Sequence, residues 1–319
     1  MTIDYREPVY DVAQLGHTEL LTPDLEASAR FFTEVYGLYR VEETADSVYL
    51  RAWGDEVLTS LKLTAAPQAG LGHVAWRAMS PQALDRRVAA IEAMGIEGRW
   101  TDGDIGHGKS FQFTAPGGHT MEVYFETEKY RAPDGEEPYL PNQPQKYRPH
   151  GVAVERIDHI NLLVPDVHAS RTFQQEALGF KPREILTPTP DTEVGAWLSL
   201  QTKAHDLALT REPAPTDGRL HHLAYEVTSR EDVLKAADIF MENNVFVEFG
   251  PAKHSRTQGF FLYVYEPGGN RIEVFAGGIH IFSPDFETVY WNTEKGGRST
   301  AWGVACPESF YNYATPSQT

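Results

Sequence analysis

The feature that most constrains the fold of this chain is an internal repeat, because a duplicated segment forms a similar structural unit wherever it occurs. Residues 13–32 (AQLGHTELLTPDLEASARFF) match residues 155–174 (ERIDHINLLVPDVHASRTFQ). Two further matches follow in the same order, 71–96 with 220–245 and 113–125 with 264–276. The repeat predicts two copies of one unit, and 319 residues suffice for two separate cores.

Within the second copy, the sequence alternates between patterns typical of strands and of helices. Residues 157–164 (IDHINLLV) are predicted as a strand, after which Pro165 and Asp166 turn the chain into a short helix. Residues 230–244 have the 3.6-residue period of an amphipathic helix. Further strands are expected at GAWLSL, HDLALT, HHLAYEV, FFLYVYE and RIEVFA. The predicted order within a copy is β-α-β-β-β, and the predicted fold class is α+β.

The domain boundaries follow from the repeat and from proline content. Five prolines and little periodicity mark residues 129–150 as a linker. The tail after Ser283 has no counterpart in the first copy and is rich in Tyr and Trp, so we expect it to pack over a module as a cap. The predicted organisation is an N-terminal domain over 1–128, the linker, a C-terminal domain over 151–283 and a tail over 284–319.

Composition excludes several classes of partner. The formal net charge of −17 repels nucleic acid and anionic membrane surfaces. The single cysteine, Cys306, cannot form an internal disulfide, which fits a reducing compartment. The polar N-terminus and the absence of any run of ~18 apolar residues argue against a membrane segment. We expect a cytoplasmic protein that acts on a small molecule.

Polar side chains stand on three predicted strands at positions where a core face normally carries apolar residues. By strand alternation, His159, His222 and Glu273 each lie on such a face. Each residue alone is more simply a satisfied core residue, but two imidazoles and one carboxylate on neighbouring strands can form a facial triad with open coordination positions. Without a thiolate, the set fits Fe(II) or Mn(II), and iron is the usual metal of oxygen chemistry. The adjacent His221 faces the other side of its strand and is assigned a structural or solvated role.

The second copy resembles a known enzyme family. The stretch HSRTQGFFLYVYEPGGNRIE (254–273), together with KAHDLALT, GRLHHLAY and IDHINLLVPDV, resembles type I extradiol dioxygenases of the catechol 2,3-dioxygenase kind. These belong to the vicinal oxygen chelate superfamily, whose members fuse β-α-β-β-β modules in pairs as curved mixed sheets. The resemblance covers nearly all of residues 13–292. It implies a catalytic cup in the C-terminal domain and a homotetramer, with metal ligands His159, His222 and Glu273 and catalytic residues His205, His254 and Tyr263.

The resemblance also implies a reaction. Fe(II) would hold a catechol and O2 together, and the ring would open beside its two hydroxyls to a 2-hydroxymuconic semialdehyde. Tyr263 and His254 would take the hydroxyl proton, and His205 would donate a proton to oxygen. Asn161, which shares a face with His159, could donate a hydrogen bond to bound oxygen.

The predicted substrate pocket favours an uncharged catechol. In the homoprotocatechuate branch, an arginine that pairs with the substrate carboxylate would fall at Phe249, and only Arg298 remains of a pair in the tail. A carboxylated catechol would therefore lack a charge-assisted partner. We expect catechol or a methyl-, alkyl- or chloro-substituted catechol, in a pocket assigned to Asn161, Trp197, Phe249 and Arg298.

The first copy repeats the three ligand positions without the catalytic residues. His17, His73 and Glu122 match the triad and permit a second metal. The positions that match His205, His254 and Tyr263 hold Thr59, Gly103 and Gln112, so we expect no catalysis there. Glu19 matches Asn161, and Arg51 falls close to the register of Trp197, which predicts an ion pair that fills this pocket.

Two alternatives stay open at this stage. One is an oxygenase of the 4-hydroxyphenylpyruvate dioxygenase kind, which also has two modules and a facial triad but lacks the segment from His254 to Tyr263. The other is a binding module of the bleomycin-resistance kind, which would leave the triad without a purpose. Ring opening of catechol in air separates both from the main prediction.

Overall fold

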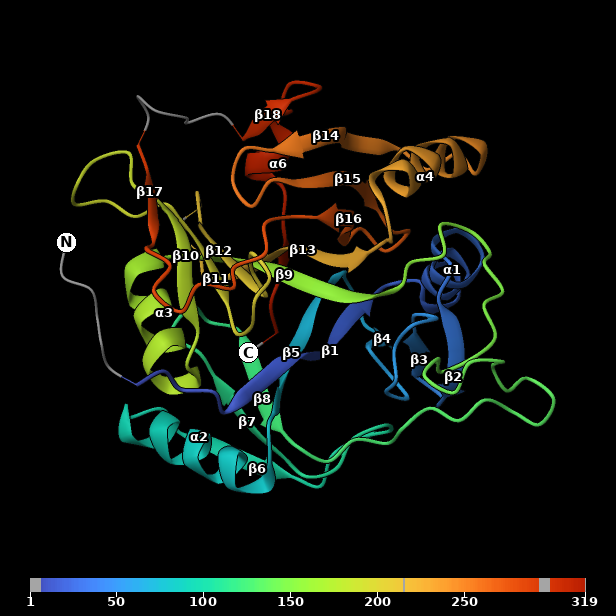
Figure 1. Ribbon diagram of the computed structural model, residues 1–319, viewed down its shortest axis with the longest axis horizontal. Helices are drawn as coiled ribbons and strands as arrows, with labels where there is room; N and C mark the ends of the chain where they lie inside the picture. Colours follow the sequence, from blue (N-terminus) through green and yellow to red (C-terminus); the bar gives the residue numbers. More distant parts are fainter. Residues whose placement is uncertain (1–6, 215, 293–298, 319) are drawn as a thin grey trace.

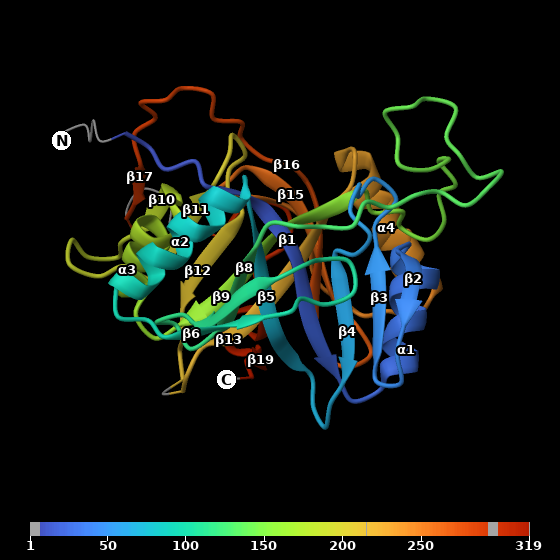
Figure 2. The same ribbon diagram turned by 90° about the horizontal axis from the view of Figure 1, so that it is seen from below.

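The computed structural model describes residues 7–214, 216–292 and 299–318, which form two mixed sheets with helices on their outer faces (Figures 1 and 2). The two copies of the repeat form one sheet each. The predicted α+β class is therefore confirmed, and neither sheet closes into a barrel. No helix in the described part of the chain is long and apolar enough to cross a membrane.

The N-terminal sheet has eight strands in the order β2-β3-β4-β1-β5-β8-β7-β6. Its strands are β1 (Val12–Thr22), β2 (Tyr39–Glu43), β3 (Ser47–Arg51), β4 (Leu61–Ala65), β5 (Gly70–Ala78), β6 (Gly98–Thr101), β7 (Ser110–Thr114) and β8 (Thr120–Tyr124). Its helices are α1 (Leu25–Arg30), the π-helical turn η1 (Phe31–Tyr36) and α2 (Pro81–Ala93).

The C-terminal sheet repeats this order and adds strands from the tail. Its repeated elements are β9 (Arg156–Val164), α3 (Val167–Phe173), η2 (Gln174–Leu178), β10 (Lys181–Leu186), β11 (Gly195–Ser199), β12 (Leu207–Arg211), β13 (Arg219–Glu226), α4 (Arg230–Glu242), β14 (Val247–His254), β15 (Gly259–Tyr265) and β16 (Arg271–Gly277). The tail contributes β17 (Val289–Trp291), β18 (Thr300–Trp302), α6 (Ser309–Asn312) and β19 (Thr315–Pro316), and its strands pair with β10, β14 and β13 respectively.

Each copy contains the order β-α-β-β-β twice, so the predicted single unit per copy was incomplete. The residue pattern did not predict β10 (KPREIL) or β14 (VEFGPAKH), because each contains a proline and neither alternates cleanly. With these strands, the first strand of each unit pairs in parallel with its last strand, as β9 does with β12 and β13 with β16. The antiparallel pair of β9 and β13 joins the two units at the centre of the sheet.

The helices of the two copies contribute to one continuous core. In α4, Ser229 and Asp232 form a capping box at the N-terminus, and Phe240 is buried on the inner face. The Phe240 ring stacks on Phe31 of the first copy at 6.4 Å between centroids. Figure 1 shows α1 beside α4 and α2 below α3. The first copy therefore supports the sheet on which the candidate site lies.

Candidate active site

The predicted triad comes together on three adjacent strands of the C-terminal sheet. His159 lies on β9, His222 on β13 and Glu273 on β16, and all three are buried. Glu273 Oε2 is 2.9 Å from His159 Nε2 and 3.1 Å from His222 Nε2, and the two nitrogens are 3.3 Å apart. Two donors at right angles, each ~2.1 Å from a metal, stand about 3.0 Å apart. The spacing therefore fits one face of an octahedral metal site.

A carboxylate fixes the orientation of His159. Its Nδ1 lies 2.6 Å from Asp158 Oδ2, so Nδ1 carries the proton and Nε2 is directed at Glu273. Lys203 Nζ, 3.1 Å from Asp158 Oδ1, compensates the buried charge. Burial opposes protonation of His159, but Glu273 and Asp158 outweigh it and raise the pKa of the imidazole to about 9. A metal bound at Nε2 would take the place of the proton that this nitrogen carries in the charged imidazole.

His221 orients the other imidazole, although the sequence analysis placed it on the opposite face. A β-bulge between Leu220 and His222 in the pairing with β9 brings His221 beside its neighbour, with their Nδ1 atoms 2.6 Å apart. His221 Nε2 donates to the main-chain oxygen of Phe310 at 2.8 Å. His221 Nδ1 must therefore accept the proton of His222 Nδ1, which leaves His222 Nε2 free to bind a cation. The assignment to the opposite face was wrong.

Replacing His221 with Phe is expected to weaken metal binding about 10- to 100-fold, the usual cost of losing a partner that orients a ligand. The ring fills the same space but accepts no proton from His222. The measurement is a metal titration of chelator-stripped protein. His168→Phe, an exposed histidine on α3, is the matched control. An unchanged metal affinity in His221→Phe would contradict the proposal that His221 orients His222.

The structure also gathers His254 and Tyr263 around Glu273. His254 Nε2 is 3.1 Å from the Tyr263 hydroxyl and 3.4 Å from Glu273 Oε1. Tyr263 pairs with Glu273 across β15 and β16 and is fully buried. Burial, reinforced by the nearby Glu273 carboxylate, raises the pKa of Tyr263 well above its usual value. The phenol therefore keeps its proton at neutral pH and acts as a hydrogen-bond donor.

His205 packs against His159, on the side of the triad away from His254. Its ring centroid is 4.0 Å from that of His159, and it lies just before β12. Burial lowers the pKa of this imidazole well below its usual value, and the neighbouring His159 adds to the effect. Imidazoles that can exchange a proton thus stand on two sides of the triad.

The predicted pocket residues take different positions. Asn161 lies opposite His222 in the pairing of β9 with β13, and its Oδ1 accepts from Thr210. Trp197 on β11 packs under the guanidinium of Arg256, 4.9 Å from its ring centroid, a contact that the sequence analysis did not anticipate. Phe249 is buried against the Tyr263 ring. Arg298 lies outside the described residues.

The N-terminal copy supports the site through a residue that no sequence motif indicated. The Tyr36 hydroxyl, at the end of η1, donates to the main-chain oxygen of Glu273 at 2.6 Å. Tyr36 is fully buried between the two copies and packs edge-on against Tyr225. The first copy thereby fixes the backbone of the strand that carries the carboxylate.

The pocket of the N-terminal copy is filled, but not by the predicted pair. Strand pairing places Tyr49, and not Arg51, at the register of Trp197. Arg51 bonds to Gln145 and the Asp55 carbonyl and lies away from Glu19. The partner of Glu19 is instead Lys62, whose Nζ is 3.4 Å from Glu19 Oε1.

Gly103 stands at the position that matches His254, but an imidazole from another residue, His107, lies beside the N-terminal triad. In the C-terminal copy, β14 continues as a strand up to His254. In the first copy, β6 ends at Thr101 and a loop follows, and this loop places His107 Nε2 3.7 Å from Glu122 Oε1. The glycine-rich segment DGDIGHG was the only sequence feature that indicated such a turn.

Comparison with known proteins agrees with this geometry. The sequence pattern of the Glyoxalase/Bleomycin resistance protein/Dioxygenase superfamily matches residues 14–123 and 156–274. The chain is 43% identical over 322 residues to a metapyrocatechase of Geobacillus stearothermophilus, covering 100% of this chain and 98% of the relative. It is 36% identical over 297 residues to a manganese-dependent 2,3-dihydroxybiphenyl 1,2-dioxygenase of Geobacillus genomosp. 3, covering 92% and 94%.

A solved structure shows the same architecture. A variant of homoprotocatechuate 2,3-dioxygenase from B. fuscum matches with a TM-score of 0.87 and 26% identity, covering 100% of this chain and 86% of the other. The chain therefore belongs to the Glyoxalase/Bleomycin resistance protein/Dioxygenase superfamily and, within it, to the extradiol ring-cleaving dioxygenases.

Proposed function

We propose that this enzyme uses Fe(II) to cleave catechol, or a catechol with an uncharged substituent, to a 2-hydroxymuconic semialdehyde. The observation that carries the proposal is the set of His159 Nε2, His222 Nε2 and Glu273 Oε2 on one side of a buried centre, with imidazoles on two flanks. A facial set of two imidazoles and one carboxylate is typical of non-haem Fe(II) oxygenases. When bound, the metal would hold both vicinal hydroxyl oxygens and lower the pKa of one of them.

The residues around the triad have separate tasks in this proposal. His254 lies 3.1 Å from the Tyr263 hydroxyl, so this pair can accept the proton that a catechol hydroxyl loses on binding. His205, on the other flank, is neutral, so its N–H can donate a hydrogen bond to oxygen. It can pass on a proton only after it has accepted one, and the second catechol hydroxyl would supply that proton. Asn161 keeps its amide donor for bound oxygen because its Oδ1 already accepts from Thr210.

The choice of an uncharged catechol rests on the side chains that enclose the site. Phe249, Phe261 and Tyr263 form an apolar cluster beside the triad, and Phe310 of the tail packs against it. Among the described residues, Arg271 lies over the Phe310 ring but is already paired with Glu248. A carboxylate placed in this cluster would therefore lose its hydration without gaining an unpaired cation from Arg271. Arg256 directs its charge at the Trp197 face and lies near Glu184.

A substrate panel tests the proposal. Chelator-stripped protein is reloaded with Fe(II) or Mn(II) and supplied with catechol, 4-methylcatechol, 4-chlorocatechol and homoprotocatechuate in air, and oxygen uptake is measured. We expect the first three to be cleaved with higher kcat/KM than homoprotocatechuate, and Fe(II) to restore more activity than Mn(II). Preference for the carboxylated catechol would overturn the substrate assignment, and preference for Mn(II) would overturn the metal assignment.

His205→Phe is expected to bind metal and catechol almost normally and to open the ring about 10²-fold more slowly, because a general acid usually contributes 10²- to 10⁴-fold. Single-turnover kinetics separate binding of catechol from the oxygen-dependent step. If the variant loses catechol binding and handles oxygen normally, the role assigned to His205 is wrong.

The assembly and location of the enzyme are part of the same proposal. We expect a homotetramer in the cytoplasm, since family resemblance supports the first and the single Cys306 fits a reducing compartment. Light scattering coupled to gel filtration checks the mass, and a monomer would contradict the assembly.

A further inference from the structure

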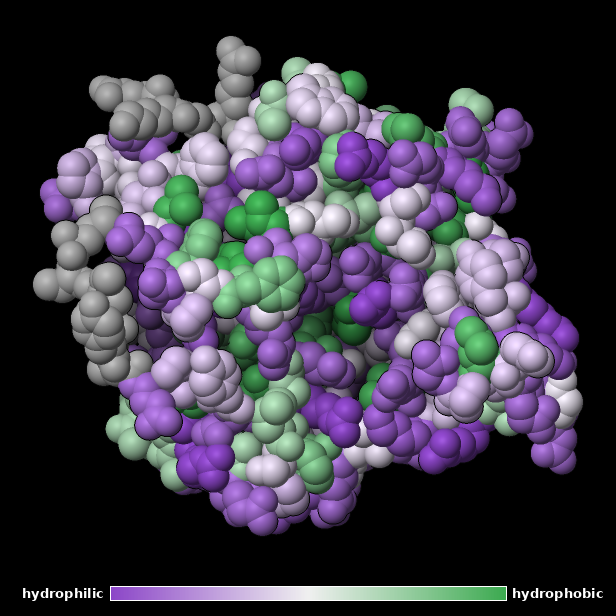
Figure 3. Space-filling view, viewed as in Figure 1, coloured by the Kyte–Doolittle hydropathy of each residue, from purple (hydrophilic) through white to green (hydrophobic). Residues whose placement is uncertain are grey.

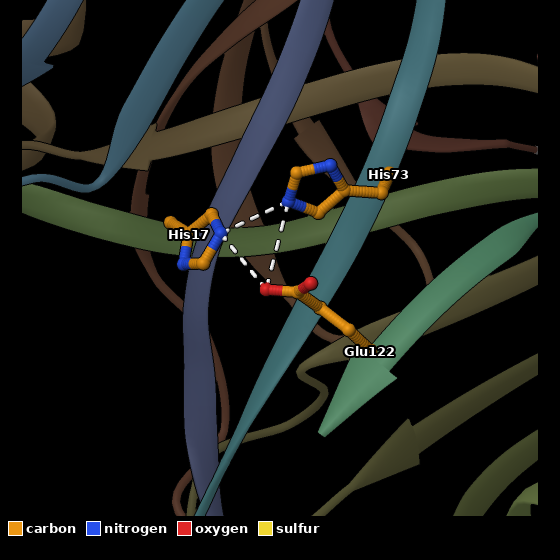
Figure 4. Close-up of side chains that lie close together, drawn as sticks. All are labelled: His17, His73 and Glu122. Carbon is orange, nitrogen blue, oxygen red and sulfur yellow. Dashed lines mark hydrogen bonds and ion pairs between the residues drawn. The ribbon is translucent and has the colours of Figure 1, made fainter. Parts of the chain in front are cut away.

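A cluster of buried imidazoles in the N-terminal copy stands apart from the proposed catalytic site. His17 on β1, His73 on β5 and Glu122 on β8 come from three adjacent strands, and Figure 4 shows both rings directed at the carboxylate. His17 Nε2 is 3.0 Å from His73 Nε2 and 3.3 Å from Glu122 Oε1, and His73 Nε2 is 3.7 Å from the same oxygen. Each of these side chains is less than 10% exposed.

The hydrogen bonds around the cluster place protons on the outer ring nitrogens, so that the lone pairs of the inner nitrogens face its centre. His73 Nδ1 lies 2.9 Å from Glu19 Oε2, and His107 Nδ1 lies 2.9 Å from the Gly108 oxygen. Because both acceptors are oxygens, each Nδ1 carries the proton and each Nε2 presents a lone pair to Glu122. A carboxylate that holds the far nitrogen of an imidazole is the arrangement found behind metal-bound histidines.

Glu122 presents an unsatisfied oxygen to the same point. Its Oε2 accepts from Ser110, but its buried Oε1 has no hydrogen-bond partner among the described residues. A buried carboxylate oxygen that no hydrogen bond satisfies is costly unless a cation binds there.

We propose that the N-terminal copy binds a second metal ion, a divalent first-row transition metal such as Zn(II), through His17, His73 and Glu122. Imidazole ligands exclude Ca(II) and Mg(II), which prefer oxygen. Tetrahedral donors ~2.1 Å from a metal stand about 3.4 Å apart, and the three separations here range from 3.0 to 3.7 Å. His107, with Nε2 3.7 Å from Glu122 Oε1, closes the fourth side of the site.

This second metal is structural and does not act on catechol. Lys62, Asp104 and Tyr49 occupy the space in front of the cluster, with Lys62 Nζ 2.6 Å from Asp104 Oδ2 and the Tyr49 hydroxyl 2.8 Å from Asp104 Oδ1. Thr59 and Gln112 hold the positions of His205 and Tyr263, and neither can transfer a proton at neutral pH. The ion instead ties the loop of His107 to strands β1, β5 and β8.

Metal counting in matched variants tests the proposal. The full chain is stripped with chelator, dialysed against Zn(II) and analysed by mass spectrometry of the elements. We expect two ions per chain in the unmodified enzyme, one in Glu122→Gln, one in Glu273→Gln and none in the double variant. His119→Gln, a buried histidine of the same copy outside the cluster, should keep two. One ion per chain that disappears in Glu273→Gln and persists in Glu122→Gln would overturn the second site.

A second measurement needs no variant. Crystals of the unmodified enzyme soaked in Zn(II) should give an anomalous peak at the zinc edge between His17, His73 and Glu122, of similar height to the peak near Glu273. The absence of a peak there would show that the cluster shares protons and binds no metal, and the proposal would fail. An enzyme that holds a metal at both sites but opens no catechol after its C-terminal site is reloaded with Fe(II) would contradict the proposed function alone.

Discussion

Glu273→Gln is expected to lose the metal from the C-terminal site and to retain less than about a thousandth of wild-type turnover. Even a partner that only orients a ligand contributes 10- to 100-fold, and Glu273 supplies the only negative charge among the three donors. The amide keeps the shape of the side chain, so the fold should persist. Metal content and oxygen uptake on the same sample provide the measurement.

The matched control is Glu226→Gln on β13. This carboxylate is only partly buried and faces Arg156, 3.4 Å away, outside the triad. It should retain metal and activity. His159→Ala and His222→Ala should behave like Glu273→Gln, because each removes one donor of the same set. Any of the three variants that keeps full activity with a normal metal content would remove its residue from the ligand set.

The triad could be predicted from the sequence because two local signals agree. The repeat gives the strand that carries each residue, and the two-residue period of a strand gives its face. His159, His222 and Glu273 all lie where these signals place them. Strand register also placed Gln112 correctly, since it pairs with Glu122 as Tyr263 pairs with Glu273. Thr59 is placed correctly as well, since it stands two residues before β4 as His205 stands two residues before β12.

The remaining features depend on backbone irregularity, which residue patterns do not record. The bulge at His221 interrupts the alternation of side chains along β13, so His221 lies on the face opposite to the predicted one. In the first copy, the loop that carries His107 replaces the end of a strand. Matching the two copies residue by residue therefore pairs His254 with Gly103 and does not find His107. Tyr36 contacts Glu273 through packing between the copies, which no local period specifies. Errors therefore gather at loops, bulges and the interface of the copies.

A buried ion pair links the tail to the site and leads to the largest expected change in stability. Arg271, on β16 two residues before Glu273, is 1% exposed. It donates to both carboxylate oxygens of Glu248, at 2.6 and 2.9 Å. It also donates to the main-chain oxygens of His221, Ser309 and Tyr313 at 3.0–3.1 Å. This guanidinium therefore bonds to the tail on both sides of Phe310, the residue that contacts His221.

Arg271→Met is expected to lower the free energy of unfolding by about 3–5 kcal/mol, because it leaves the Glu248 carboxylate buried without a counter-charge. Urea unfolding at fixed metal concentration measures the change. Arg40→Met, which breaks an exposed pair with Glu43, should change stability by less than about 1 kcal/mol. A loss of similar size in both variants would mean that the buried pair has no special role.

The pH dependence of Arg271→Met separates loss of the ion pair from a simple packing defect. Burial opposes ionisation of Glu248, but its hydrogen bonds to Arg271 and the charge of Arg271 outweigh it and lower the pKa of the carboxyl. A lowered pKa stabilises the fold above the unfolded value of about 4.3, and this contribution is lost as the pH falls through the folded value. In the variant, the unpaired carboxyl can protonate and relieve its own burial. The gap in stability between wild type and Arg271→Met should therefore be widest near pH 7 and should narrow below about pH 4. A gap that stays constant with pH would assign the whole effect to packing.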